Sequence, residues 1–92
     1  MKPAKHYTVD KLIKFKGYDT DKEMSEWFPI PEDFITEERA VKWFNRLVER
    51  HPQESWKVTE TTVTTGRVDG IYQYIYTHKT IKKNLANLNP NL

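Results

Sequence analysis

Alternating positions, or a high content of β-branched residues, mark three stretches of this chain as candidate β-strands. Residues 6–16 alternate up to Gly17, residues 56–65 are rich in valine and threonine, and residues 71–79 alternate isoleucine with tyrosine. Residues 66–70 separate the last two stretches and contain two glycines and an Asp-Gly pair suited to a tight turn. The pattern therefore predicts a strand near the N-terminus and an antiparallel hairpin in the second half of the chain.

A helical period replaces the alternation after Thr36. The Thr36 hydroxyl is a suitable N-cap, and Glu37 and Glu38 follow at the positive end of the helix dipole. Apolar residues then recur at three- and four-residue spacing: Ala40, Val41, Phe44, Leu47 and Val48. Because the residue before a proline avoids helical geometry, the helix is expected to end at His51, before Pro52.

Two segments show neither period. Residues 17–35 include Pro29 and Pro31, which cannot donate to a sheet ladder. We interpret this segment as an acidic loop held to the core by aromatic residues near Trp27, or alternatively as an edge hairpin whose second strand begins near Glu23. Residues 80–92 contain four asparagines and a proline, which predict an irregular, mobile tail.

These elements predict one α+β domain over residues 1–92. Its expected order is β-(loop or β)-α-β-β, with a single amphipathic helix packed on a three- to four-stranded antiparallel sheet. The order of strands within the sheet stays open. The chain has no cysteine for a disulfide, and no apolar run long enough for a signal peptide or membrane span. We therefore expect a soluble, cytoplasmic protein without membrane contact.

Charge is distributed unevenly along the chain. Residues 17–38 contain eight of the thirteen carboxylates and one lysine, for a net charge of −7, whereas the whole chain has a net charge of +2. Such segregation indicates a charged surface that meets a partner. A solvated surface is the ordinary alternative.

A basic helix face is the first candidate binding surface. On a helical wheel Arg39, Lys42, Arg46 and Arg50 fall within an arc of about 80°, beside Trp43. Such a face can grip phosphates, and the indole ring can stack on a partner. The alternative is an ordinary solvated helix face, since basic residues near a helix C-terminus are favourable by themselves.

Further candidates lie on the strands and in the acidic segment. Lys14 and Lys16 point to one side of the first strand and can extend a basic surface, or can protect a sheet edge from aggregation. A possible acidic interface comprises Asp19, Asp21, Glu23 and Glu26. Tyr72, Tyr74 and Tyr76 share one face of the last strand, where they are expected to cover the core under the helix, or else to form an exposed contact surface.

Catalytic and metal-binding motifs are not found in the sequence. The three histidines lack ligand spacing, neither serine sits in a nucleophile elbow, and three glycines provide no phosphate-cradling loop. The Asp19-x-Asp21-x-Glu23 spacing does not continue into a calcium loop, because Ile30 occupies the twelfth position. We therefore expect a non-enzymatic binding protein without cofactor, metal or small-molecule substrate.

In size, single helix, few strands, missing cofactor motifs and uneven charge, the chain resembles small phage-encoded anti-CRISPR proteins, in particular inhibitors of the type I-F surveillance complex. The resemblance covers the whole chain and carries no signature residue. It implies stoichiometric binding to Cas subunits in the host cytoplasm, with guide RNA as one point of contact, and exclusion of target DNA. The alternative function is that of a small phage or bacterial nucleic-acid-binding accessory protein.

Overall fold

The computed structural model describes residues 4–18 and 21–86, which form one antiparallel sheet and one helix. Along the chain the elements are β1 (Ala4–Lys16), β2 (Glu23–Phe34), α1 (Glu37–Arg50), β3 (Trp56–Val68) and β4 (Ile71–Asn84). The sheet order is β2-β1-β3-β4, and every neighbouring pair is antiparallel. The α+β fold and the order β-β-α-β-β confirm the predicted fold class, with the hairpin alternative realised at β2.

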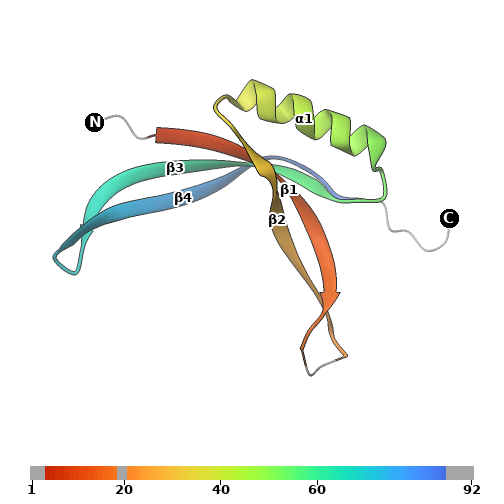
Figure 1. The fold of residues 1–92 in the computed structure, drawn as a ribbon, viewed down its shortest axis with the longest axis horizontal. Helices are drawn as coiled ribbons and strands as arrows, with labels where there is room; N and C mark the ends of the chain where they lie inside the picture. The colour runs from red at the N-terminus through yellow and green to blue at the C-terminus, as the bar shows by residue number, and fades with distance from the viewer. Residues whose placement is uncertain (1–3, 19–20, 87–92) are drawn as a thin grey trace.

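The sheet consists of two long hairpins that diverge from a central crossing, while α1 lies across one face (Figure 1). One hairpin is β1–β2 and the other is β3–β4, and β1 pairs with β3 at the centre. The molecule is consequently thin, with extents of 53 × 38 × 20 Å. Each hairpin extends beyond the area that the helix covers.

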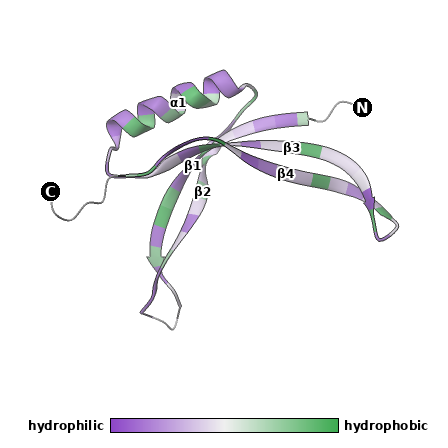
Figure 2. Ribbon diagram, turned by 180° about the vertical axis from the view of Figure 1, so that it is seen from behind, coloured by the Kyte–Doolittle hydropathy of each residue, from purple (hydrophilic) through white to green (hydrophobic). Residues whose placement is uncertain are grey.

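The core lies between α1 and the centre of the sheet. Its buried members are Val9, Phe34, Ala40, Phe44, Trp56 and Val58. Partly buried residues pack around them, including the predicted helix positions Val41, Leu47 and Val48. Hydrophobic and hydrophilic bands alternate along α1 in Figure 2, as the helical period predicted.

Local signals set the ends of the helix as expected. The Thr36 hydroxyl accepts a hydrogen bond from the backbone N–H of Arg39 at 3.3 Å. At the other end the backbone N–H of His51 donates to the carbonyl of Leu47 at 2.8 Å. The indole N–H of Trp56 donates to the His51 carbonyl at 3.5 Å, which ties the helix end to β3.

The acidic segment contains a strand, so its interpretation as a loop is wrong and the alternative of an edge hairpin is correct. β2 pairs with β1 from Glu23 to Phe34, although it contains Pro29 and Pro31. An edge strand tolerates proline because one side of its backbone has no neighbour. Between the pairs Thr8–Asp33 and Asp10–Pro29 the register shifts, and irregularities of this kind bend a strand locally.

The remaining strands differ from their expected lengths at their outer ends. β4 continues to Asn84, so the first five residues of the expected tail at 80–92 are strand, and residues 87–92 lie outside the described part. The tight turn contains only Asp69 and Gly70, with φ values of 52° and 79°. Positive φ at both positions matches the type I′ turn that an Asp-Gly pair favours.

Candidate functional site

The basic ridge, defined as Arg39, Lys42, Arg46 and Arg50, lies on the exposed side of α1. Trp43 is 38 % exposed beside it. The Trp43 ring packs against Phe34 of β2 with centroids 6.4 Å apart, and the Arg46 guanidinium carbon lies 5.7 Å from the Trp43 centroid. The ring is thus held between the sheet edge and a ridge cation, in a position where it can contact a partner.

An open pocket of about 430 Å³ adjoins the ridge. Arg39, Lys42 and Arg46 line it together with Trp43, while Asp33 and Phe34 contribute from the end of β2. The helical period predicts that the helix residues share one face, and the structure shows that β2 forms the other side of this pocket. Asp33 adds one carboxylate to an otherwise cationic and aromatic lining.

The ridge cations are not neutralised by ion pairing within the described residues. The ion pairs found there are Lys5 with Glu60, at 3.6 Å, and Lys11 with Glu54, at 3.7 Å, and neither uses a helix residue. The helix glutamates at positions 37, 38 and 49 are likewise exposed. Positive charge on the ridge therefore remains available to an anionic group.

The strand lysines do not join the ridge. Lys14 and Lys16 share one side of β1, as predicted, but they lie on the outer part of the β1–β2 hairpin, away from α1 (Figure 1). Lys16 is paired in register with Glu23 of β2. The two lysines therefore belong to a separate region of the molecule.

The lysines at the end of β4 divide between the two faces of the sheet. Lys82 Nζ lies 5.5 Å from the Phe44 ring centroid and donates to the Asn45 side-chain oxygen at 3.4 Å. Lys83 Nζ lies 5.8 Å from the ring centroid of Trp27, which also has Lys57 Nζ at 4.8 Å. Trp27 therefore faces away from the helix rather than anchoring the core.

The possible acidic interface is divided between two faces of β2. Asp19 lies outside the described residues, and Asp21 is exposed between β1 and β2. Glu23 and Glu26 are exposed on β2, where their three-residue spacing places them on opposite faces of a strand. The structure therefore does not gather Glu23 and Glu26 on one face.

The tyrosines of β4 face solvent, so the expectation that they cover the core is wrong. Tyr72, Tyr74 and Tyr76 are 69, 68 and 58 % exposed. The alternate face carries Ile75, whose side chain lies over Gly66, where a Cβ would come within 2.7 Å of Ile75 Cδ1. The tyrosines lie on the outer part of the β3–β4 hairpin, which extends beyond α1, so the helix covers neither face of the sheet there.

A polar cluster on the face opposite α1 was not found from the sequence. Asp10 is 6 % exposed and accepts hydrogen bonds from the hydroxyls of Thr8, at 2.9 Å, and Thr59. Thr61 Oγ1 shares a hydrogen bond of 2.9 Å with His78 Nδ1. These residues line an open groove of about 590 Å³ with Trp27 and Tyr76 at its sides. Only the pairing of distant strands assembles this groove, so no local pattern could reveal it.

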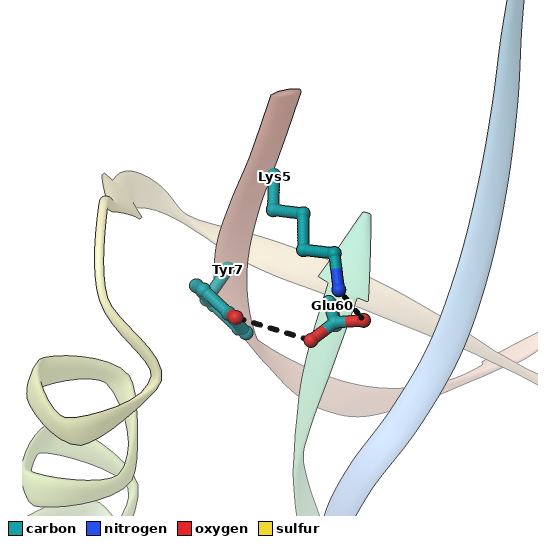
Figure 3. Close-up of polar contacts among 3 residues, drawn as sticks. All are labelled: Lys5, Tyr7 and Glu60. Atoms are coloured by element: carbon teal, nitrogen blue, oxygen red, sulfur yellow. Dashed lines mark hydrogen bonds and ion pairs between the residues drawn. The ribbon is translucent and has the colours of Figure 1, made fainter. Parts of the chain in front are cut away.

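A second polar cluster lies on the helix side of the sheet (Figure 3). The Tyr7 hydroxyl donates to Glu60 Oε2 at 3.0 Å, and Lys5 Nζ lies 3.6 Å from Glu60 Oε1. Burial raises the pKa of Tyr7 above its ordinary value of 10.0, and the Glu60 carboxylate and the more distant Glu37 raise it further. This cluster joins β1 to β3 and holds a neutral phenol between acidic groups.

Comparison of the chain with protein-family models, curated protein sequences and solved structures found no match. Within residues 4–18 and 21–86, no helix has the length and apolar character to cross a membrane. The same residues contain no group of three or more histidine, aspartate or glutamate side chains arranged to hold a metal ion. The basic ridge with Trp43 is thus the candidate surface on which several predicted residues come together.

Proposed function

We propose that the protein is a non-enzymatic inhibitor that binds a nucleoprotein complex, in the form of an anti-CRISPR protein that binds Cas subunits, contacts guide RNA and blocks target DNA. The observation that carries this proposal is the basic ridge. Its four cations lie on one exposed helix face, and none forms an ion pair within the described residues. A surface of this kind favours a partner that presents phosphates or carboxylates.

The ridge residues differ in what they can bind. Arg39 and Arg46 present planar guanidinium groups that pair with phosphate or carboxylate through two parallel hydrogen bonds. Lys42 between them contributes a point charge to the same pocket. Trp43 supplies an aromatic surface of the kind enriched at protein interfaces. A partner surface made of protein and RNA offers carboxylates and phosphates to the cations and a protein surface to the Trp43 ring. This match supports a ribonucleoprotein as the partner.

The test uses a purified type I-F surveillance complex and labelled target DNA. We expect saturating protein to co-elute with the complex in gel filtration and to abolish its binding of target DNA in a gel-shift assay. Co-elution without loss of DNA binding would show that the protein binds the complex but does not inhibit its binding of target DNA, which would contradict the inhibitor function. Unchanged elution and unchanged DNA binding would contradict the anti-CRISPR form of the proposal.

Direct nucleic-acid binding is the second candidate function, favoured by the exposed tyrosines of β4. Aromatic rings on a sheet face stack on unpaired bases, and Arg67 is paired in register with Tyr72. Fluorescence anisotropy with labelled single-stranded RNA and DNA tests this function. We expect the logarithm of the affinity to fall linearly with the logarithm of salt concentration. No measurable affinity for the free protein at low salt would contradict direct binding.

A further inference from the structure

The two edges of the sheet differ in their protection against pairing with another strand. β2 and β4 are the edge strands, since the order is β2-β1-β3-β4. The outer backbone groups of β4 therefore have no strand partner among the described residues. Such an edge is a template for another strand unless prolines, charges or bulges protect it.

β2 has all three kinds of protection. It contains Pro29 and Pro31, and its register is interrupted by a bulge next to Pro29. It also carries four carboxylates, at Glu23, Glu26, Glu32 and Asp33. Like charges of two such strands would repel each other, and the prolines remove donors from the ladder. Pairing of two molecules through β2 is therefore disfavoured.

The first half of β4 has none of these features. From Ile71 to Thr77 it contains no proline and no charged residue, and its pairing with β3 is regular from Ile71 to Thr80. Ile71 is 66 % exposed, and the three tyrosines are exposed to a similar degree. A long, regular and neutral edge with exposed aromatic residues is suited to pairing.

We infer that β4 pairs antiparallel with β4 of a second copy, so that two sheets join into one across a two-fold axis at Tyr74. In this register Tyr74 faces Tyr74 of the other copy, and Tyr72 faces Tyr76. Opposed residues of antiparallel strands lie on the same face. The tyrosines of both copies thus form one aromatic cluster on the side opposite the helices.

Charge complementarity favours pairing with a second copy of the chain, and it favours this register. With the axis at Tyr74, Lys79 of each copy lies opposite the turn residue Asp69 of the other. An axis one position further, at Ile75, would oppose Lys79 to Ile71 and leave Asp69 without a basic partner. The pairing uses the same strand of both copies, and the remaining β2 edges are protected, so assembly closes at two copies.

The absence of cysteine from the sequence allows a direct test by single-cysteine variants. Opposed Cα atoms in an antiparallel pair are about 4.5 to 5.5 Å apart, which suits a disulfide. We expect Tyr74→Cys to form a disulfide-linked dimer under mild oxidation. Residue 72 lies about 13 Å from its own symmetry mate in this register, because four residues of strand separate them. Tyr72→Cys and Tyr76→Cys should each stay monomeric on denaturing gels when oxidised alone, yet cross-link when mixed.

Tyr18→Cys is the control for random collision, since Tyr18 is 94 % exposed and lies outside β4.

A second measurement uses sedimentation equilibrium of the unmodified chain and of Tyr74→Lys. We expect a dimer whose dissociation constant rises by roughly tenfold when two lysines oppose each other at the axis. A monomer at about 100 µM would overturn the inference. Cross-linking of Tyr18→Cys as rapid as that of Tyr74→Cys, or cross-linking of Tyr72→Cys alone, would also overturn it.

Discussion

The hydroxyl of Thr59 on β3 donates a hydrogen bond to the buried carboxylate of Asp10 on β1. Thr8 donates to the other carboxylate oxygen at 2.9 Å, so two hydroxyl groups replace the water that Asp10 loses on folding. A buried carboxylate without such donors would be costly. The pair therefore fixes the relative position of the two hairpins at the centre of the sheet.

Replacing Thr59 by valine tests this relationship. Thr59→Val removes one of the two donors and leaves a carboxylate oxygen unsatisfied, so we expect a loss of about 1.5–3 kcal/mol in the free energy of unfolding. Urea denaturation followed by circular dichroism measures the change. Thr65→Val is the matched control, because Thr65 is an exposed position on the same strand. Equal stability of the two variants would show that the Asp10 bond contributes little.

Truncation of Phe44 tests the helix packing. Phe44 is 2 % exposed in the core between α1 and the sheet. Phe44→Ala leaves a cavity and should lower the free energy of unfolding by about 3–5 kcal/mol. The exposed neighbour Lys42→Ala should change it by less than about 0.5 kcal/mol. Chemical denaturation of both variants checks the difference, and a small effect at Phe44 would contradict the proposed core.

Alkaline titration tests the Tyr7 cluster. The pKa of Tyr7 in the folded protein is raised above 10.0 by burial and by Glu60, so folding favours the protonated phenol. This contribution to stability is complete below about pH 10 and is lost as pH rises through the raised pKa. Melting temperatures between pH 8 and 11.5 should fall more steeply for the unmodified chain than for Tyr7→Phe. Parallel curves would contradict a raised pKa.

Charge reversal tests the basic ridge. Arg39→Glu combined with Arg46→Glu should abolish binding to the nucleoprotein partner and change the melting temperature little, because exposed charges contribute little to stability. Lys22→Glu combined with Arg67→Glu is the control, since both residues are exposed, lie off the helix and change the net charge equally. Gel filtration with the partner complex measures binding. Normal binding by the folded ridge variant would show that the ridge is merely solvated.

Elements with strong local signals were predicted from the sequence. The Thr36 cap and the proline after His51 located the helix, and the pair Asp69-Gly70 located the β3–β4 turn. The helix signals also placed the ridge residues on one face, where the structure has them. These features depend on neighbouring residues alone, so periodicity and capping preferences are sufficient to find them.

Features that depend on distant contacts were predicted only as alternatives, as for β2, or not at all. β2 lacks an alternating pattern because only Phe34 is buried along it and a register shift interrupts its pairing with β1, and as an edge strand it tolerates Pro29 and Pro31. The tyrosine orientation depends on where the helix ends relative to β4, which no local pattern records. The groove around Asp10 requires the pairing of β1 with β3, and Asp33 reaches the ridge only because β2 lies next to α1.

Because the core lies where the two hairpins cross, the length of each hairpin can change without altering the core. Side chains alternate with a period of two residues, so shortening both strands of a hairpin by two residues turns no remaining side chain to the other face. The outer parts of the hairpins contribute none of the buried core residues, which lie between α1 and the sheet centre. The 53 Å length of the molecule can therefore change by removing or adding two residues in each strand of a hairpin, while the packed centre is retained.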